Sequence, residues 1–131
     1  MRHRSGPLLL LILTFGTTGC SSGQETAAED AARSFYQAVE ARDGQAACGL
    51  LTSTTRQELE DSSGKPCPEA VLEEITAPAA DLQAHAYGTM AQVRSSTDTA
   101  FLHRAQGRWL VLAARCVPTP RGPYDCQVKG N

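Results

Sequence analysis

The sequence lacks most of the groups from which catalytic and metal-binding motifs are built. Its 131 residues include three histidines and one tryptophan, and no Gly-rich phosphate loop or C-x-x-C pair occurs. Without close cysteine pairs a four-cysteine zinc site is disfavoured, so we expect neither a metal nor a cofactor. The basic residues form no Lys/Arg run, which argues against nucleic acid as a partner.

Long apolar runs are also absent. The longest apolar stretch, Leu8–Phe15, would rise about 12 Å as a helix, against a hydrocarbon core of about 30 Å. It follows the basic residues Arg2 and Arg4 and precedes small residues that end at Cys20, an order typical of a secretory signal. We therefore predict a signal peptide over residues 1–19 and an exported mature chain.

The end of this signal, Thr17-Thr18-Gly19-Cys20, resembles a bacterial lipobox. The resemblance implies cleavage before Cys20, a palmitate-type lipid on its sulfur and a protein held on the extracytoplasmic face of the cell membrane. A plain secretory signal with an incidental cysteine is the alternative. The small polar residues that follow predict a flexible tether over residues 20–25, and residues 26–131 have the length of a single domain.

Charge divides the mature chain into two unlike parts. Residues 20–81 carry twelve acidic against four basic side chains, a net of −8. Residues 82–131 carry two acidic against six basic side chains, a net of +4. We expect one face of the domain to be acidic and the other to be mildly basic.

Four cysteines remain once Cys20 is assigned to a lipid. An even number in an exported chain indicates disulfides, for which three connectivities are possible. Pairing the cysteines that are neighbours in the sequence closes loops of about 20 and 11 residues. Each disulfide would then stabilise the fold by about 3 kcal/mol, because it lowers the entropy of the unfolded chain. We predict the disulfides Cys48–Cys67 and Cys116–Cys126.

Apolar spacing predicts four helices in the first half of the mature chain, over residues 27–42, 45–51, 54–62 and 68–75. The first has a capping box at Thr26–Glu29 and a left-handed stop at Gly44. Asp43 is placed to cap the second helix, and Pro68 suits the first position of the fourth. The first disulfide would then join the second helix to the start of the fourth.

From Leu82 onward the apolar period changes to two, which is typical of strands. Strands are expected over residues 82–87, 90–94, 100–105 and 108–115, and the last of these is apolar on both faces, as in the interior of a sheet. Pro118, Pro120 and Pro123 are expected to prevent regular structure between Cys116 and Cys126, with an edge strand at residues 127–129. Helices followed by antiparallel strands indicate an α+β fold.

Two stretches carry a resemblance to a known family. Phe35–Ala47 is similar to the first two helices of nuclear transport factor 2-like domains, and Gly107-Arg108-Trp109 is similar to their closing Gly-x-Trp strand. The resemblance implies helices packed on a curved antiparallel sheet that forms a cone. The ten arginines against two lysines, the abundant alanine and the paired cysteines also resemble small exported lipoproteins of high-GC actinobacteria.

Relatives in this family include isomerases, dehydratases and cyclases, so a pocket inside the cone is expected. Its lining would be drawn from Phe35, Tyr36, Val39, His85, Tyr87 and Trp109. In the steroid isomerases a tyrosine that donates to the oxyanion falls at the place of Phe35, which has no hydroxyl. We therefore predict a non-catalytic module that binds a protein or a small apolar ligand. The alternative is a cone-pocket enzyme that uses His85 or Tyr87.

The lipid anchor can be tested by the substitution Cys20→Ser. We expect the variant to accumulate as an unprocessed precursor, and the wild-type protein to partition into membranes and detergent, because two acyl chains anchor a protein stably. The mature N-terminus is read by mass spectrometry. A wild-type N-terminus at any residue other than Cys20 would contradict the prediction.

Overall fold

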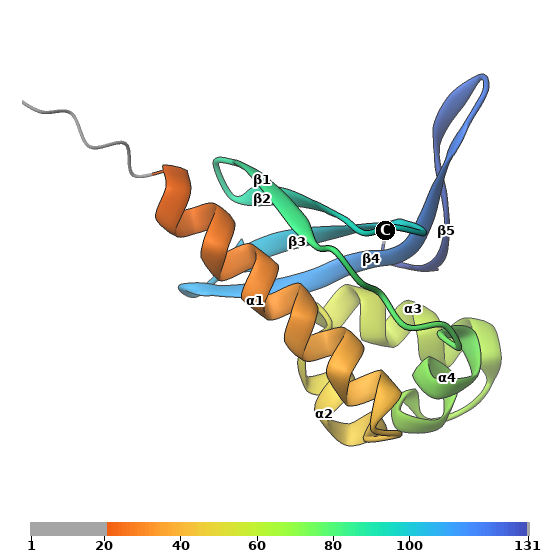
Figure 1. Cartoon of the computed structure of the whole chain (residues 1–131). Coiled ribbons are helices and arrows are strands. Elements are labelled where there is room, and N and C mark those ends of the chain that lie inside the picture. Colours follow the sequence, from red (N-terminus) through yellow and green to blue (C-terminus); the bar gives the residue numbers. More distant parts are fainter. Residues whose placement is uncertain (1–20, 131) are drawn as a thin grey trace, which may run out of the picture.

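The computed structural model describes residues 21–130, so the predicted signal and Cys20 lie outside the described residues. The described chain contains, in order, helices α1 (Ser21–Glu40), α2 (Gly44–Gly49), α3 (Ser53–Ser63) and α4 (Cys67–Glu74), then strands β1 (Gln83–Tyr87), β2 (Met90–Arg94), β3 (Thr99–Ala105), β4 (Arg108–Thr119) and β5 (Gly122–Lys129). The predicted α+β fold, with helices packed on a curved antiparallel sheet, is confirmed (Figure 1). Within this range no helix has the length and apolarity to cross a bilayer.

Helix α1 begins earlier than its sequence indicates. Thr26 does not cap it: the Thr26 hydroxyl lies inside the helix and donates to the Ser22 carbonyl at 3.0 Å. Residues 21–25 are therefore helical, and the flexible tether expected there is not present in the structure. At the other end Arg42, with φ 60°, takes the left-handed conformation that was expected at Gly44.

The shorter helices follow local capping rules closely. The Asp43 carboxylate accepts from the Ala46 amide at 3.0 Å and starts α2, as predicted. The Thr52 hydroxyl accepts from the Thr55 amide at 3.1 Å and starts α3, which ends at the left-handed Gly64. The predicted disulfide Cys48–Cys67 is present and joins α2 to the first residue of α4.

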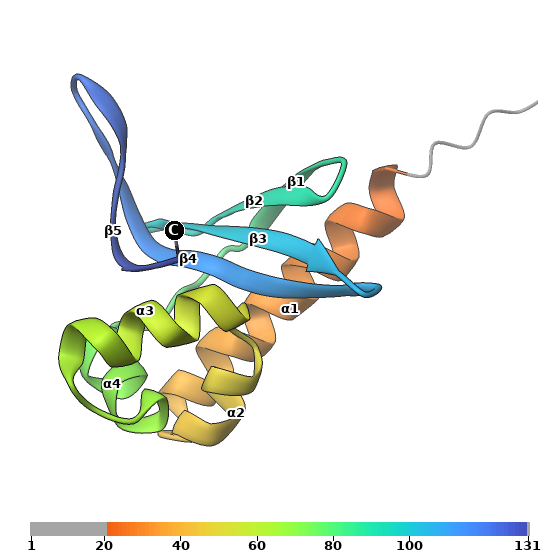
Figure 2. The same ribbon diagram turned by 180° about the vertical axis from the view of Figure 1, so that it is seen from behind.

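The five strands form an antiparallel sheet in the order β1-β2-β3-β4-β5, and α1 lies across one of its faces (Figures 1 and 2). We call this the inner face. The strand register sets Ala86, Ala91, Leu102 and Val111 in one row of it. Phe35 of α1 is fully buried in the same core cluster. Helix α1 and the sheet therefore close the core between them.

Strand β4 bends where its register with β3 shifts, between the pairs Thr99↔Cys116 and Leu102↔Val111. Arg115, in this stretch, has φ 57°. Irregularities of this kind bend a strand and increase its twist. Beyond the bend the β4–β5 hairpin leaves the plane of the sheet and rises on the side opposite α1 (Figures 1 and 2).

The prolines do not interrupt this hairpin, contrary to the sequence-based expectation. Pro118 lies within β4 and Pro123 within β5, and the ladder continues to the pair Thr119↔Gly122. The hairpin tip is a two-stranded ribbon, so both strands have a free edge where a missing N–H costs no ladder bond. The predicted disulfide Cys116–Cys126 is present at its base, and the expected edge strand is the end of β5.

A close backbone approach at Gly44 provides a test of the helical packing. A Cβ at Gly44 would lie 2.0 Å from the Pro68 carbonyl oxygen, whereas a Cβ at Gly49 would meet nothing within 4 Å. We expect Gly44→Ala to lower the free energy of unfolding by about 1–3 kcal/mol, because backbone must shift. Gly49→Ala is the matched control and should stay within about 0.5 kcal/mol. Equal urea midpoints for the two variants would contradict this packing.

Candidate binding face

The structure does not bring the six expected pocket residues together. Phe35, Tyr36, Val39 and Trp109 belong to the buried core. Tyr87 is 70 % exposed, and the His85 side chain is 51 % exposed with its Nδ1 3.9 Å from Glu25 Oε1. Both lie on the edge strand β1 and are exposed to solvent there.

Buried side chains of the core fill the space between α1 and the sheet. A cavity of about 200 Å³ lies between the end of α1 and residues 75–78, and its lining includes Tyr36 and Val39. Ligand pockets for small molecules usually measure about 300–1,000 Å³. This cavity is therefore small for a substrate site, and neither His85 nor Tyr87 lines it. His85 lines a separate hollow of about 380 Å³ between the start of α1 and β1, which none of the other five expected pocket residues lines.

A buried polar cluster lies at the bend of β4. The Asp98 side chain is 2 % exposed and accepts from Arg115 Nη1 at 3.2 Å and from the Ser95 hydroxyl at 2.6 Å. Arg115 is the residue with φ 57°, so its ion pair holds the bend. The Tyr36 hydroxyl is buried without a hydrogen bond; burial, and then the negative charge of Asp98, raise the pKa of Tyr36 above its usual value.

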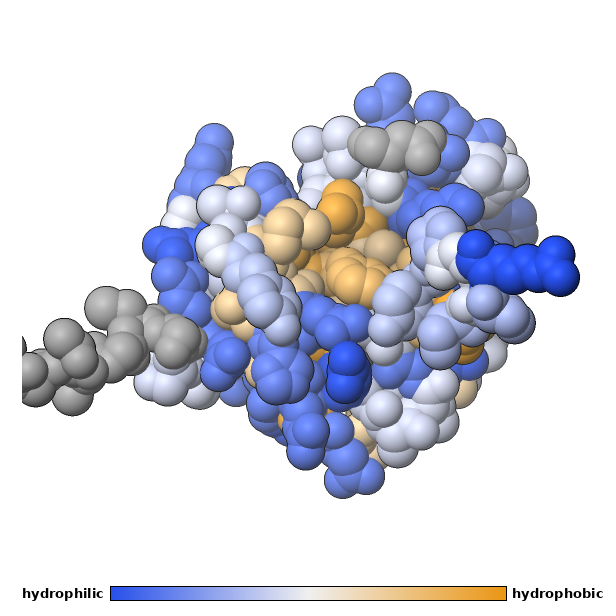
Figure 3. Space-filling view, turned by 90° about the horizontal axis from the view of Figure 1, so that it is seen from above, coloured by the Kyte–Doolittle hydropathy of each residue, from blue (hydrophilic) through white to orange (hydrophobic). Residues whose placement is uncertain are grey.

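The sheet face opposite α1 is not covered by any helix of the described chain, and we call it the outer face. The register sets Tyr87, Met90, His103 and Leu110 in one row of it, and His85, Gln92, Phe101, Ala113 and Lys129 in the next. Phe101 and Leu110 are half-buried but do not belong to the core cluster or pack against it. Seen from above, apolar side chains gather at the centre of this face and hydrophilic ones surround them (Figure 3).

The β4–β5 hairpin forms a wall at one side of the outer face. Tyr124 of the hairpin packs edge-to-face on Phe101, with the ring centroids 5.0 Å apart. Gln92 Nε2 donates to the Tyr124 hydroxyl at 3.0 Å. One apolar contact and one hydrogen bond thus join the hairpin to the strands of the outer face. We call the place where Tyr124 meets Phe101 and Gln92 the corner at Tyr124.

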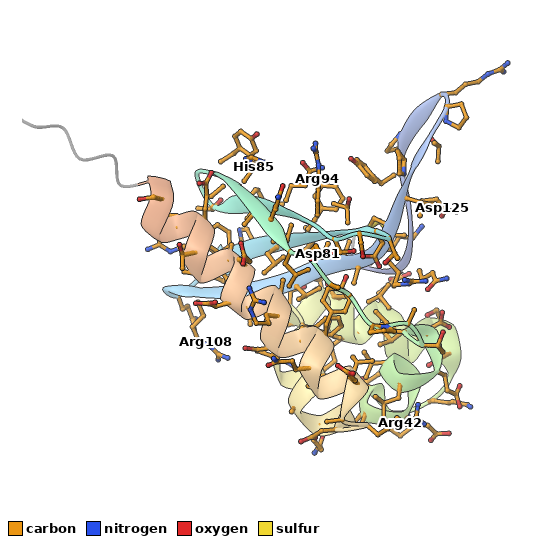
Figure 4. The ribbon with its side chains drawn as sticks, in the orientation of Figure 1. Arg42, Asp81, His85, Arg94, Arg108 and Asp125 are labelled. Carbon is orange, nitrogen blue, oxygen red and sulfur yellow. A yellow bond between two sulfur atoms is a disulfide. The ribbon has the colours of Figure 1, made fainter. Side chains whose placement is uncertain are left out.

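The rows of the outer face carry basic groups and no carboxylate. A third row pairs Gln83, Arg94 and Thr99, so the basic side chains of the three rows are Arg94, Lys129 and two histidines. Arg94 projects from the sheet on the side opposite α1 (Figure 4). The mildly basic face expected from the charge distribution is therefore this one.

Sequence reasoning named His85 and Tyr87 but missed the apolar residues at the centre of this face. Phe101, Leu110 and Tyr124 were not singled out, although the apolar character of both faces of residues 108–115 was a signal. In a sheet covered on one side only, a strand that is apolar on both faces must leave one apolar face uncovered. Which residues share that face depends on the register, which the sequence alone does not show.

No family model matches the chain, and neither the curated proteins nor the solved structures include a match to it. The resemblance to nuclear transport factor 2-like domains therefore stays an expectation from the sequence.

The buried Tyr36 hydroxyl leads to a prediction about alkaline stability. Because the folded state raises the pKa of Tyr36 above its unfolded value of about 10, this group destabilises the fold as the pH rises above about 10. Tyr36→Phe should therefore lose less stability between pH 9 and pH 11 than the wild-type protein. At pH 7 the substitution should change the free energy of unfolding by less than about 1 kcal/mol, because no hydrogen bond is lost.

Urea unfolding at several pH values measures this effect, with Tyr87→Phe as the control because it removes an exposed hydroxyl. If Tyr36→Phe loses as much stability between pH 9 and pH 11 as the wild-type protein does, this hydroxyl is not the titrating group.

Proposed function

We propose that the protein is a lipoprotein on the extracytoplasmic face of the cell membrane and that its domain is a non-catalytic module that binds a partner on the outer face. The observation that carries this proposal is the uncovered apolar centre of that face, with Phe101 and Leu110 outside the core (Figure 3). Soluble monomers rarely expose large contiguous apolar patches, and such patches with a polar rim mark interaction sites.

The shape of the face favours a protein as the partner over a small ligand. Small-molecule sites are enclosed clefts that bury most of their ligand. The outer face is broad, and the β4–β5 hairpin bounds it on one side (Figure 1). A protein surface can cover such a floor and pack against the wall at Tyr124, where Phe101 supplies an aromatic anchor of the kind found in binding hot spots.

The two disulfides support an exported location. Cys48–Cys67 and Cys116–Cys126 each join neighbouring elements of the fold. Structural disulfides persist in oxidising compartments and are rare where glutathione and thioredoxin keep thiols reduced. This agrees with the signal expected at residues 1–19 and with the anchor expected at Cys20.

Photo-crosslinking in cells that produce the full chain tests the binding face. A photoreactive residue at Lys129, which is exposed and lies in the same row of the outer face as Phe101, should form adducts with a protein. One at Gln57, an exposed residue of α3, should not. Leu110→Glu should reduce the Lys129 adducts about tenfold, because it buries an unpaired charge in the interface. The thermal midpoint of Leu110→Glu is measured alongside and should be retained, since Leu110 lies outside the core.

Two results would contradict the proposal. One is adduct formation from Lys129 that Leu110→Glu leaves unchanged. The other is turnover of a steroid enone or a polyketide-like substrate that is abolished by His85→Ala or Tyr87→Phe, which would favour the cone-pocket enzyme.

A further inference from the structure

Three segments gather at the end of the domain from which the chain leads back to Cys20. They are the start of α1, the turn between β1 and β2, and the turn between β3 and β4 (Figures 1 and 2). Arg104 Nη1 donates to Gln24 Oε1 at 2.7 Å, which ties the end of β3 to the first turn of α1. We call residues 22–25, 87–90 and 104–108 together the anchor end.

The anchor end has a short connection to the expected lipid. Helix α1 is already formed at Ser21, the residue that follows Cys20. The first turn of α1 therefore follows directly, in the chain, the residue that the proposed function assigns to the acyl chains. Without a flexible spacer the anchor end stays beside the bilayer rather than at a distance from it.

Side chains at the anchor end have the chemistry of a membrane interface. Tyr87 and Met90 are 70 % and 37 % exposed, which is unusual for large apolar side chains of this domain. Arg104 and Arg108 are exposed at the neighbouring turn, where Figure 4 shows Arg108. Tyrosine suits the headgroup level of a bilayer, and arginine buries its stem while its guanidinium binds phosphate oxygens.

The acidic residues nearby do not cancel this chemistry. Glu25 lies 3.9 Å from His85, and Glu29 forms an ion pair with Arg33. Arg108 has no ion pair among the described residues. A basic group of this kind near the surface attracts anionic lipid.

We propose that the anchor end lies on the bilayer, with Tyr87 and Met90 among the headgroups and Arg104 and Arg108 on the phosphates of anionic lipids. The inference rests on the anchor at Cys20 that the proposed function includes. It sets the orientation of the domain: the β4–β5 hairpin, at the opposite end of the sheet, stands away from the membrane (Figure 1). The corner at Tyr124 is then open to a partner.

Quenching of tryptophan fluorescence by brominated lipid tests the orientation. The full chain is purified from bacterial membranes and placed in phosphatidylglycerol-rich vesicles whose acyl chains carry bromine near the headgroup. Two variants each add one tryptophan to the shared Trp109: Tyr87→Trp at the anchor end, and Arg121→Trp at the exposed tip of the hairpin. We expect the added fluorescence of Tyr87→Trp to be quenched at least twofold more than that of Arg121→Trp.

A second pair of substitutions tests the basic groups. In the Tyr87→Trp chain, Arg108→Gln should reduce the quenching, whereas Arg56→Gln, an exposed arginine of α3 toward the far end of the domain, should not. Replacing phosphatidylglycerol by phosphatidylcholine should reduce it as well, because the attraction requires anionic lipid.

The mass of the N-terminal peptide shows whether Cys20 is acylated, and so tests the lipid anchor separately from the orientation of the domain. If Cys20 is not acylated, its free thiol is coupled to a maleimide lipid in the same vesicles, so that the orientation is measured in either case. Equal quenching of the two tryptophan variants, or stronger quenching of Arg121→Trp, would overturn the proposed orientation.

Discussion

The bend of β4 at Arg115 is the constraint on which the binding face depends. The first part of β4 runs through the sheet and contributes to the outer face. The second part turns away from the sheet and forms, with β5, the hairpin at the side of that face (Figure 1). A non-glycine residue at φ 57° is an uncommon conformation that the surroundings must stabilise. The ion pair with the buried Asp98 provides this, since removing Arg115 would leave the Asp98 carboxylate buried without its partner charge.

The rest of β4 is held along its other edge by the helical half of the chain. The Val111 amide donates to the Leu50 carbonyl at 2.8 Å, and the Thr52 amide donates to the Val111 carbonyl at 2.9 Å. The Thr55 hydroxyl and the Gly130 amide both donate to the Leu112 carbonyl. The connection between α2 and α3 thereby covers the part of β4 that β5 does not reach, and it leaves fewer unpaired backbone groups at that edge.

The sheet is apolar on two faces but is covered on one. Helix α1 and the helical half bury the inner face, and the disulfide Cys48–Cys67 secures that packing. On the outer face the half-buried Phe101 and Leu110 keep contact with water, which costs about 25 cal/mol for each Å² of apolar surface left exposed. A partner that covers them recovers this free energy, which is the physical basis of the proposed binding role.

Local rules in the sequence determined most of the elements. The apolar spacing with Asp43 as a cap, the change of apolar period near Leu82, and the short spacing of the paired cysteines predicted the helices, most of the strands and both disulfides. These signals act within a few residues or through short loops, so they do not depend on the rest of the fold.

Tertiary structure decided the remainder. Thr26 lies inside α1 because the helix continues to Ser21, and Pro118 and Pro123 fit in strands because the hairpin tip has free edges. His85 and Tyr87 were separated from Phe35 and Trp109 by the sheet itself, and Phe101, Leu110 and Tyr124 were brought together by the register and the bend of β4. A register shift of one residue reverses the face on which a side chain lies, so no local pattern could have predicted this face.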